Sequence, residues 1–216
     1  MSIFRQIAIV CGALLFLGSI AARFPVAPAP DVDEVYPLPF DWTGLRVLHI
    51  GDSHVYAGLT STLRKHLRSA GARYIPVNWI GSRSKSWVAS GKLRRLLDKH
   101  SPNVVIVTLG TNAMKIRNPK KYAHWIRALV RRIGPRTCYW MGPPSLLEDR
   151  FGFNEILAEA SAPCSYFDTR KMGFPKREDH HFHLTRAQGE QWGASTWEWM
   201  NFPENRPASR EESDAL

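Results

Sequence analysis

Hydrophobic side chains between residues 45 and 200 fall into two kinds of pattern. Short apolar runs predict buried strands, and the unbroken β-branched run at residues 103–109 (NVVIVTL) is typical of the centre of a parallel sheet. Four more such runs cover residues 45–50, 73–80, 138–141 and 165–168. Because Pro76 has no backbone N–H to give to a neighbouring strand, we expect residues 73–80 to form an edge strand.

Helical periodicity appears between these strands. After the first run, apolar residues recur every four positions and predict a helix with an inward stripe of Val55, Leu59, Leu63 and Leu67. Residues 87–99 predict a less regular helix. Asn118 and Pro119 are a favourable pair for a helix N-terminus, and the apolar face that follows contains Tyr122, Trp125, Ile126, Leu129, Val130 and Ile133.

A final helix is predicted after Thr185, which forms a capping box with Gln188 and precedes Trp192 and Trp199 on the expected buried side. Strands that alternate with helices are typical of a parallel sheet covered on both faces. The sequence therefore predicts an α/β fold, a flavodoxin-like three-layer α/β/α arrangement around a five-stranded parallel sheet.

The two ends of the chain differ from this alternating region. Residues 1–22 combine Arg5, an apolar stretch at 7–20 and small residues after it, which predicts a signal peptide or N-terminal anchor. The apolar stretch is shorter than the roughly 20 residues of a spanning helix, which favours cleavage. Residues 23–44 are predicted to form a Pro-rich linker, residues 45–200 the folded domain, and residues 201–216 a disordered tail. We expect a periplasmic or extracellular protein, attached to the inner membrane only if the first segment is retained.

The chain is strongly basic, with a net charge of +10 and eight Lys or Arg but no acid in residues 115–136. In an exported protein such a surface indicates attraction to an anionic envelope polymer or to lipid headgroups, and a merely solvated basic face is the alternative. Export and the lack of a recognised binding motif argue against nucleic acid.

Polar clusters follow three of the predicted strands and precede the last helix. They are Gly51-Asp52-Ser53, Gly81-Ser82, Gly110-Thr111-Asn112 and the stretch at residues 179–185. Because the carboxyl ends of parallel strands meet at one edge, these clusters should lie together there. Ser53, in an abrupt strand-to-helix turn, occupies a position suited to a nucleophile. A phosphate-binding loop is disfavoured, since no GxGxxG is present and Ser86 stands where a P-loop ending at Gly91-Lys92 would require Gly.

This ordered set resembles the SGNH hydrolases, also called the GDSL family of esterases and lipases. The family's Ser, Gly, Asn and His fall on Ser53, Gly81, Asn112 and His183, and the resemblance covers residues 45 to about 200. It implies a serine esterase that needs no cofactor. Ser53 would be the nucleophile and His183 the base, while the oxyanion would bind the backbone N–H groups of Ser53 and Gly81 and the side-chain amide of Asn112.

The acid of the triad departs from the family pattern. The family Asp stands three residues before the His, whereas here His180 occupies that position and Asp179 lies four before His183. Three arrangements stay open: Asp179 orients His183 through a one-residue bulge, the acid comes from elsewhere, or a Ser-His dyad acts alone. His180, His181 and His183 could also suggest a metal, but neither a helical HxxxH spacing nor a Cys partner supports a zinc site, and we predict none.

Residues 82–87 should line the mouth of the site, where Arg83 is a candidate contact for an acidic or sugar substrate. Trp87 is a candidate to stack on a sugar ring, although it could equally begin the apolar face of the next helix. Cys138 and Cys164 lie at the beginnings of two strands expected to be neighbours, so a disulfide between them is a hypothesis for an oxidising compartment.

Together these features predict an exported serine esterase that removes small acyl groups, most simply O-acetyl, from an envelope or extracellular carbohydrate. Two alternatives stay open at this point. One is an acyltransferase or accessory domain of polysaccharide O-acylation that uses the same Ser53 and His183. The other is a non-catalytic carbohydrate-binding protein with the same fold.

Overall fold

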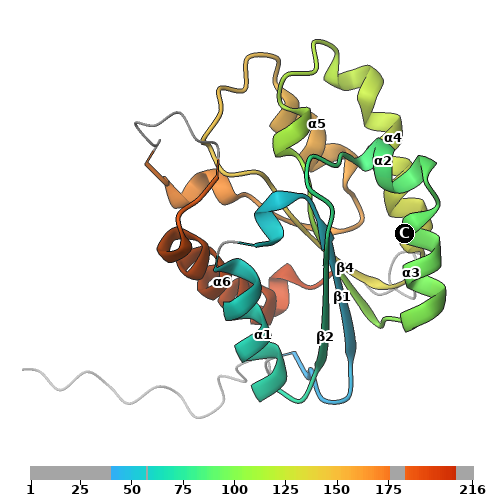
Figure 1. Ribbon diagram of the computed structural model, residues 1–216, viewed down its shortest axis with the longest axis vertical. Helices are drawn as coiled ribbons and strands as arrows, with labels where there is room; N and C mark the ends of the chain where they lie inside the picture. Colours follow the sequence, from blue (N-terminus) through green and yellow to red (C-terminus); the bar gives the residue numbers. More distant parts are fainter. Residues whose placement is uncertain (1–39, 57, 176–182, 208–216) are drawn as a thin grey trace, which may run out of the picture. The chain divides into compact units, whose positions relative to one another are not determined.

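The computed structural model describes residues 40–56, 58–175 and 183–207 (Figure 1). Its sheet contains β2 (Arg73–Asn78), β1 (Arg46–Gly51), β3 (Val104–Thr108), β4 (Thr137–Met141) and β5 (Ser165–Phe167), in this spatial order. Every neighbouring pair is parallel. The predicted five-stranded parallel sheet is confirmed, and β2, which contains Pro76, lies at an edge as expected.

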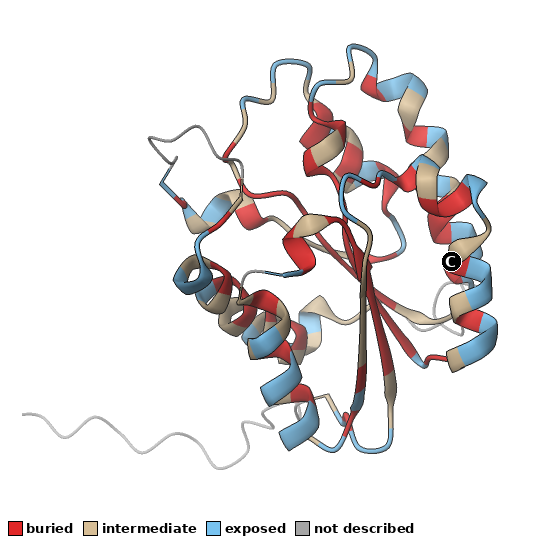
Figure 2. Cartoon of the chain, viewed as in Figure 1, coloured by how far each residue is buried: buried red, intermediate tan, exposed pale blue. Residues whose placement is uncertain are grey.

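Helices cover both faces of this sheet (Figure 1). One face packs on α1 (Leu59–Ser69) and α6 (Arg186–Asn201). The other packs on α2 (Ser84–Ala89), α3 (Lys92–His100), α4 (Pro119–Ile133) and α5 (Phe153–Ala160). Neighbouring side chains of β3 point to opposite faces: Val104 and Ile106 join one core, Val105 and Val107 the other. Figure 2 shows the strands buried between these layers, so the predicted three-layer α/β/α fold is confirmed.

Two predicted helices differ from the observed ones. The first was expected to include Val55, but residues Ser53–Val55 form a short 3-10 helix and α1 begins only after Gly58. The region at 87–99 contains two helices, α2 and α3, which are separated at Ser90 and Gly91; Gly91 has a left-handed backbone that an α-helix cannot continue through.

Helix α5 was not predicted from the sequence. Its first N–H groups are bound by a side chain outside the usual capping position: the two Asp149 oxygens accept from Phe153 N at 2.7 Å and Asn154 N at 2.8 Å. Asp149 lies three residues before the Gly152 N-cap, so the local sequence shows no standard helix-start pattern.

The hypothesised disulfide is present between Cys138 in β4 and Cys164 immediately before β5. The two strands pair with Tyr139 opposite Ser165, which places the cysteines side by side with their Cα atoms 4.6 Å apart. The bond therefore joins the edge strand β5 to the rest of the sheet.

The folded domain extends beyond residues 45–200 at both ends. Trp42, in the predicted linker, is 2% exposed and donates from Nε1 to Asn201 Oδ1 at 2.9 Å. At the other end, Pro203–Asn205 form a 3-10 helix within the predicted tail. Residues 1–39 and 208–216 lie outside the described residues. In the part that is described, no helix is both long and apolar enough to cross a membrane.

Candidate active site

Ser53 lies directly beyond the carboxyl end of β1, where the chain turns sharply. A side chain on Gly51 would collide with the Thr108 carbonyl of β3 and with Val55, so the close approach of these strands requires glycine there. Asp52 then caps the short 3-10 helix, accepting from His54 N at 3.0 Å. Ser53 is the first residue of that helix and is only partly buried, which leaves its hydroxyl accessible at the sheet edge.

His183 supplies the partner of this hydroxyl from 130 residues away in sequence. Ser53 Oγ lies 2.8 Å from His183 Nε2, a hydrogen-bond distance. His183 lies next to the start of α6, where Thr185 N donates to Gln188 Oε1 at 2.8 Å and Gln188 N to Thr185 Oγ1 at 3.3 Å. The predicted capping box is thus confirmed, and it fixes the chain two residues after His183.

The predicted acid, Asp179, lies outside the described residues, as do His180 and His181. Its contact with His183 stays a prediction. His54 also lies beside His183, with its ring centroid 5.4 Å from that of the His183 ring.

Gly81 and Asn112, the other two predicted site residues, are placed by the turns after β2 and β3. Gly81 has φ of 71° in a turn closed by a 3.0 Å bond from Ser82 N to Trp79 O, and a side chain at Gly81 would point into open space. Asn112 Nδ2 donates to Asp52 Oδ2 at 3.0 Å and to the Ser82 carbonyl at 3.2 Å. Both amide protons are therefore engaged, and an oxyanion bound by Asn112 would have to displace one of these acceptors.

Asp52 connects the nucleophile turn to Asn112. It is 1% exposed, and burial, only partly offset by hydrogen bonds from His54 N–H and Asn112, raises its pKa to about 7. From sequence alone, Asp52 is predicted only as part of the turn that carries Ser53. Its contact with Asn112 was missed because it depends on the side-by-side placement of β1 and β3, which no local pattern reports.

The two predicted substrate-binding residues have different surroundings. Arg83 is exposed and lines a pocket together with Thr111, Asn112, Lys115 and Leu147. Trp87 is fully buried and donates from Nε1 to Ser82 Oγ at 2.9 Å, so of the two alternatives for this residue, sugar stacking is wrong and a place on the apolar face of the helix is confirmed. It packs edge-on against Trp79, because α2 turns this face toward the core. Lys115 was missed; its position three residues after Asn112 was the available signal.

Comparison with known proteins supports the fold. No family model matches the chain, and no curated protein matches it in sequence. Among solved structures, the acetyl xylan esterase AlAXEase has a TM-score of 0.61 and 15% identity, covering 71% of this chain and 98% of its own. LAE5, an alpha/beta hydrolase enzyme from the metagenome of Lake Arreo in Spain, has a TM-score of 0.59 and 14% identity, covering 75% and 100%.

A third structure comes from Desulfitobacterium hafniense DCB-2 and is assigned to the G-D-S-L family of lipolytic proteins. Its TM-score is 0.54 with 13% identity, and the match covers 72% of this chain and 99% of that one. At these identities the likeness concerns the fold and not the substrate. The chain has the three-layer fold of the SGNH, or GDSL, hydrolases, as the order of its motifs predicted.

Proposed function

We propose that this protein is an exported serine esterase of the SGNH type, which removes small acyl groups from an envelope or extracellular carbohydrate. The observation that carries the proposal is the 2.8 Å contact between Ser53 Oγ and His183 Nε2 at the carboxyl edge of the sheet. A serine hydroxyl becomes an effective nucleophile when a histidine at this distance can take its proton.

The reaction follows from the placement of these two groups. Ser53 Oγ attacks the ester carbonyl carbon while His183 Nε2 takes the hydroxyl proton, and the carbonyl oxygen becomes an oxyanion. Collapse of this intermediate breaks the bond to the alcohol, which leaves with the proton from His183. Water then attacks the acyl-serine with His183 again as base, which releases the acid and restores Ser53.

Oxyanion stabilisation is assigned to the N–H groups of Ser53 and Gly81 and to Asn112. The Ser82 carbonyl accepts the longer of the two bonds from Asn112, 3.2 Å against 3.0 Å for Asp52, so we infer that the oxyanion displaces Ser82. Loss of one such donor typically lowers turnover about a hundred- to a thousandfold. Asp179 is proposed to orient His183.

Two further features support the finer parts of the proposal. The disulfide between Cys138 and Cys164 is typical of an oxidising compartment and agrees with a signal-like segment at residues 1–22. Acetyl as the acyl group and a carbohydrate as the alcohol are supported by the acetyl xylan esterases among proteins of the same fold.

Hydrolysis of 4-nitrophenyl acetate by the purified protein tests the chemistry. Ser53→Ala and His183→Ala should each lower kcat at least a thousandfold, whereas the matched controls Ser61→Ala and His124→Ala, at exposed positions, should retain activity. A folded protein without turnover, or a Ser53→Ala variant that keeps it, would refute the esterase. Acetyl transfer to an added sugar that exceeds hydrolysis would instead support the acyltransferase.

A further inference from the structure

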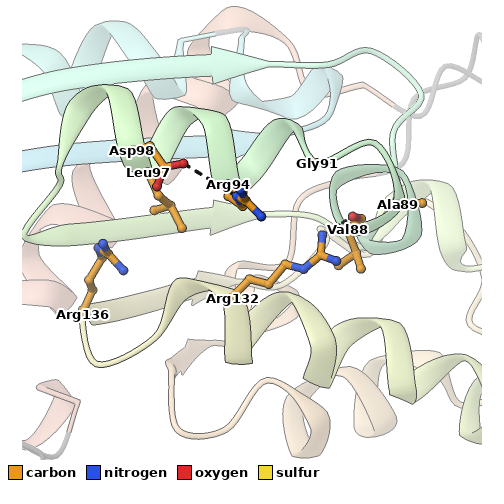
Figure 3. A pocket seen from close by; sticks show the side chains of 8 residues that line it. All are labelled: Val88, Ala89, Gly91, Arg94, Leu97, Asp98, Arg132 and Arg136. Atoms are coloured by element: carbon orange, nitrogen blue, oxygen red, sulfur yellow. Dashed lines mark hydrogen bonds and ion pairs between the residues drawn. The ribbon is translucent and has the colours of Figure 1, made fainter.

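The basic hollows of the described chain differ in whether their cations already have partners within the protein. The hollow in Figure 3 lies among α2, α3 and the C-terminal part of α4, and shares no residue with the site around Ser53. Its arginines are occupied by the protein itself. Arg132 donates to the Val88 carbonyl, Arg136 donates to the Ile133 and Pro102 carbonyls at 2.6 and 3.2 Å, and Arg94 pairs with Asp98 at 3.8 Å. Arg132 thereby joins α4 to α2, and Arg136 joins the end of α4 to the loop before β3.

The pocket beside Asn112 is different. It has a volume of about 190 Å³, which suits one small group, and it is lined by Arg83 and Lys115 without any acidic residue. Among the described residues, neither the Arg83 guanidinium nor the Lys115 ammonium has an ion-pair partner. Two positive charges therefore line one small hollow, and the described chain supplies no anion to compensate them.

The pocket is joined to the catalytic groups through Asn112. The amide of Asn112 contacts both Asp52, which precedes Ser53, and the Ser82 carbonyl, which precedes Arg83. These bonds tie the turn that carries Arg83 to the turn that carries Lys115. An ester whose carbonyl lies at Ser53 therefore has its nearby substituents within reach of a preformed cationic pocket.

We propose that Arg83 and Lys115 form a subsite for an anionic oxygen group, a carboxylate or a phosphate, carried by the substrate near its ester bond. The inference rests on the proposed esterase function and narrows its substrates to acidic sugar esters. A guanidinium presents paired N–H donors that match either group, and the ammonium adds a second charge. Thr111 and Leu147 complete the walls.

A longer substrate would find further cations beside this subsite. Another hollow shares Lys115 and Leu147 with the pocket beside Asn112 and adds Arg117, Arg150 and the exposed Phe151. Its one acid, Glu148, is paired with Arg150 at 3.2 Å. The neighbouring unit of an acidic polymer can therefore lie beside the same basic surface.

The test compares three acetyl esters that share one aromatic frame: 3-acetoxybenzoate, 3-acetoxyphenyl phosphate and the uncharged 3-acetoxybenzamide. For each protein variant, kcat/KM for an anionic ester is divided by kcat/KM for the uncharged ester, and this ratio measures the preference for an anion that the subsite provides. Arg83→Gln and Lys115→Gln should each lower this ratio about tenfold for at least one anion, mainly through KM. The control Lys120→Gln is at an exposed position in α4 and lines neither the pocket beside Asn112 nor the hollow next to it. It should leave the ratio unchanged. The two anionic esters show whether the pocket prefers carboxylate or phosphate.

Failure of the subsite and failure of the esterase give different results. If the acetyl ester of 3-acetoxybenzamide is hydrolysed but Arg83→Gln and Lys115→Gln leave the kcat/KM ratios unchanged, the subsite alone is overturned. If no ester is cleaved, calorimetric titration with trigalacturonate and with inorganic phosphate decides the question. Binding that both substitutions weaken would support the anion site without the esterase, and the absence of binding would overturn it.

Discussion

Replacing Asp52 with Asn should remove a pH dependence from the stability of the whole domain. Burial raises the pKa of Asp52 from 3.8 to about 7, so between these values the carboxyl is protonated in the folded protein and ionised in the unfolded one. The folded state then binds more protons, and the free energy of unfolding falls as the pH rises through this window. Well above pH 7, Asp52 is ionised in both the folded and the unfolded protein, and the full loss of unfolding free energy is present. Asn does not ionise, so the variant should lack this loss.

The magnitude follows from the same two pKa values. Each pKa unit between folded and unfolded protein corresponds to about 1.4 kcal/mol. By linkage, ionisation of Asp52 costs the wild type about 2 kcal/mol of stability at pH 5 and about 4 kcal/mol at pH 8. The variant also loses one hydrogen bond, because the Asn side chain has one acceptor oxygen, and its NH2 group, a donor, cannot accept from His54 N–H or from Asn112. That cost is the same at every pH. Relative to wild type, Asp52→Asn should therefore gain roughly 2 to 3 kcal/mol between pH 5 and pH 8.

Urea unfolding of both proteins at several pH values between 5 and 8 measures this difference, because groups that both proteins share cancel in the comparison. Asp98→Asn is the control, since Asp98 is an exposed carboxylate whose only ion pair with another described residue is the 3.8 Å contact with Arg94. It should follow the wild type within about 0.5 kcal/mol at every pH. A difference between Asp52→Asn and wild type that stays constant over this range would refute the claim that burial holds Asp52 protonated.

Three further substitutions test the surroundings of the site. Trp87→Phe removes a buried hydrogen bond and part of a buried ring, so urea unfolding should show that the free energy of unfolding falls by about 1–3 kcal/mol. KM for 4-nitrophenyl acetate should stay the same. A raised KM with unchanged stability would instead support a role for Trp87 in substrate binding. Replacing Cys138 and Cys164 together by Ala opens a loop with a sequence separation of 26 and should cost about 3–4 kcal/mol in the same assay; a loss below about 1 kcal/mol would contradict this loop-entropy argument. Thr185→Ala removes the cap beside His183 and should cost about 1 kcal/mol and also lower kcat; unchanged kcat would show that the cap does not position the base.

The parts of the fold that sequence could predict are those set by local patterns. The β-branched run of β3, the Asn118-Pro119 start of α4 and the capping box of α6 each need only neighbouring residues to specify them. His49 has no partner in the local sequence, and the folded sheet places it between Tyr74 Oη at 2.6 Å and Thr108 Oγ1 at 2.7 Å. The start of α5 could not be predicted, because the side chain that caps it lies in the preceding loop.

The candidate site also has a part that local sequence predicts and a part that depends on contacts between distant segments. Ser53, Gly81, Asn112 and His183 could be found because each follows a strand or precedes a helix in a fixed order. The direction of the Trp87 side chain could not be predicted, since an aromatic residue within a short helix can point to the core or to solvent with the same local sequence. Nor could the pairing of Asn112 with Asp52, which exists only because β1 and β3 are adjacent in the sheet.

Asp52 links the stability of the domain to the chemistry proposed at its edge. Its burial makes the folded state less stable at neutral and alkaline pH, yet its carboxyl holds both the His54 N–H and the Asn112 amide in place beside Ser53. A destabilising group is retained where it positions others, which is common at functional sites. The Asn variant, with one acceptor oxygen in place of two, cannot hold both donors in the same positions. The gain in stability at pH 8 should therefore come with a lower kcat, because an oxyanion donor that is displaced by even a small distance loses most of its effect.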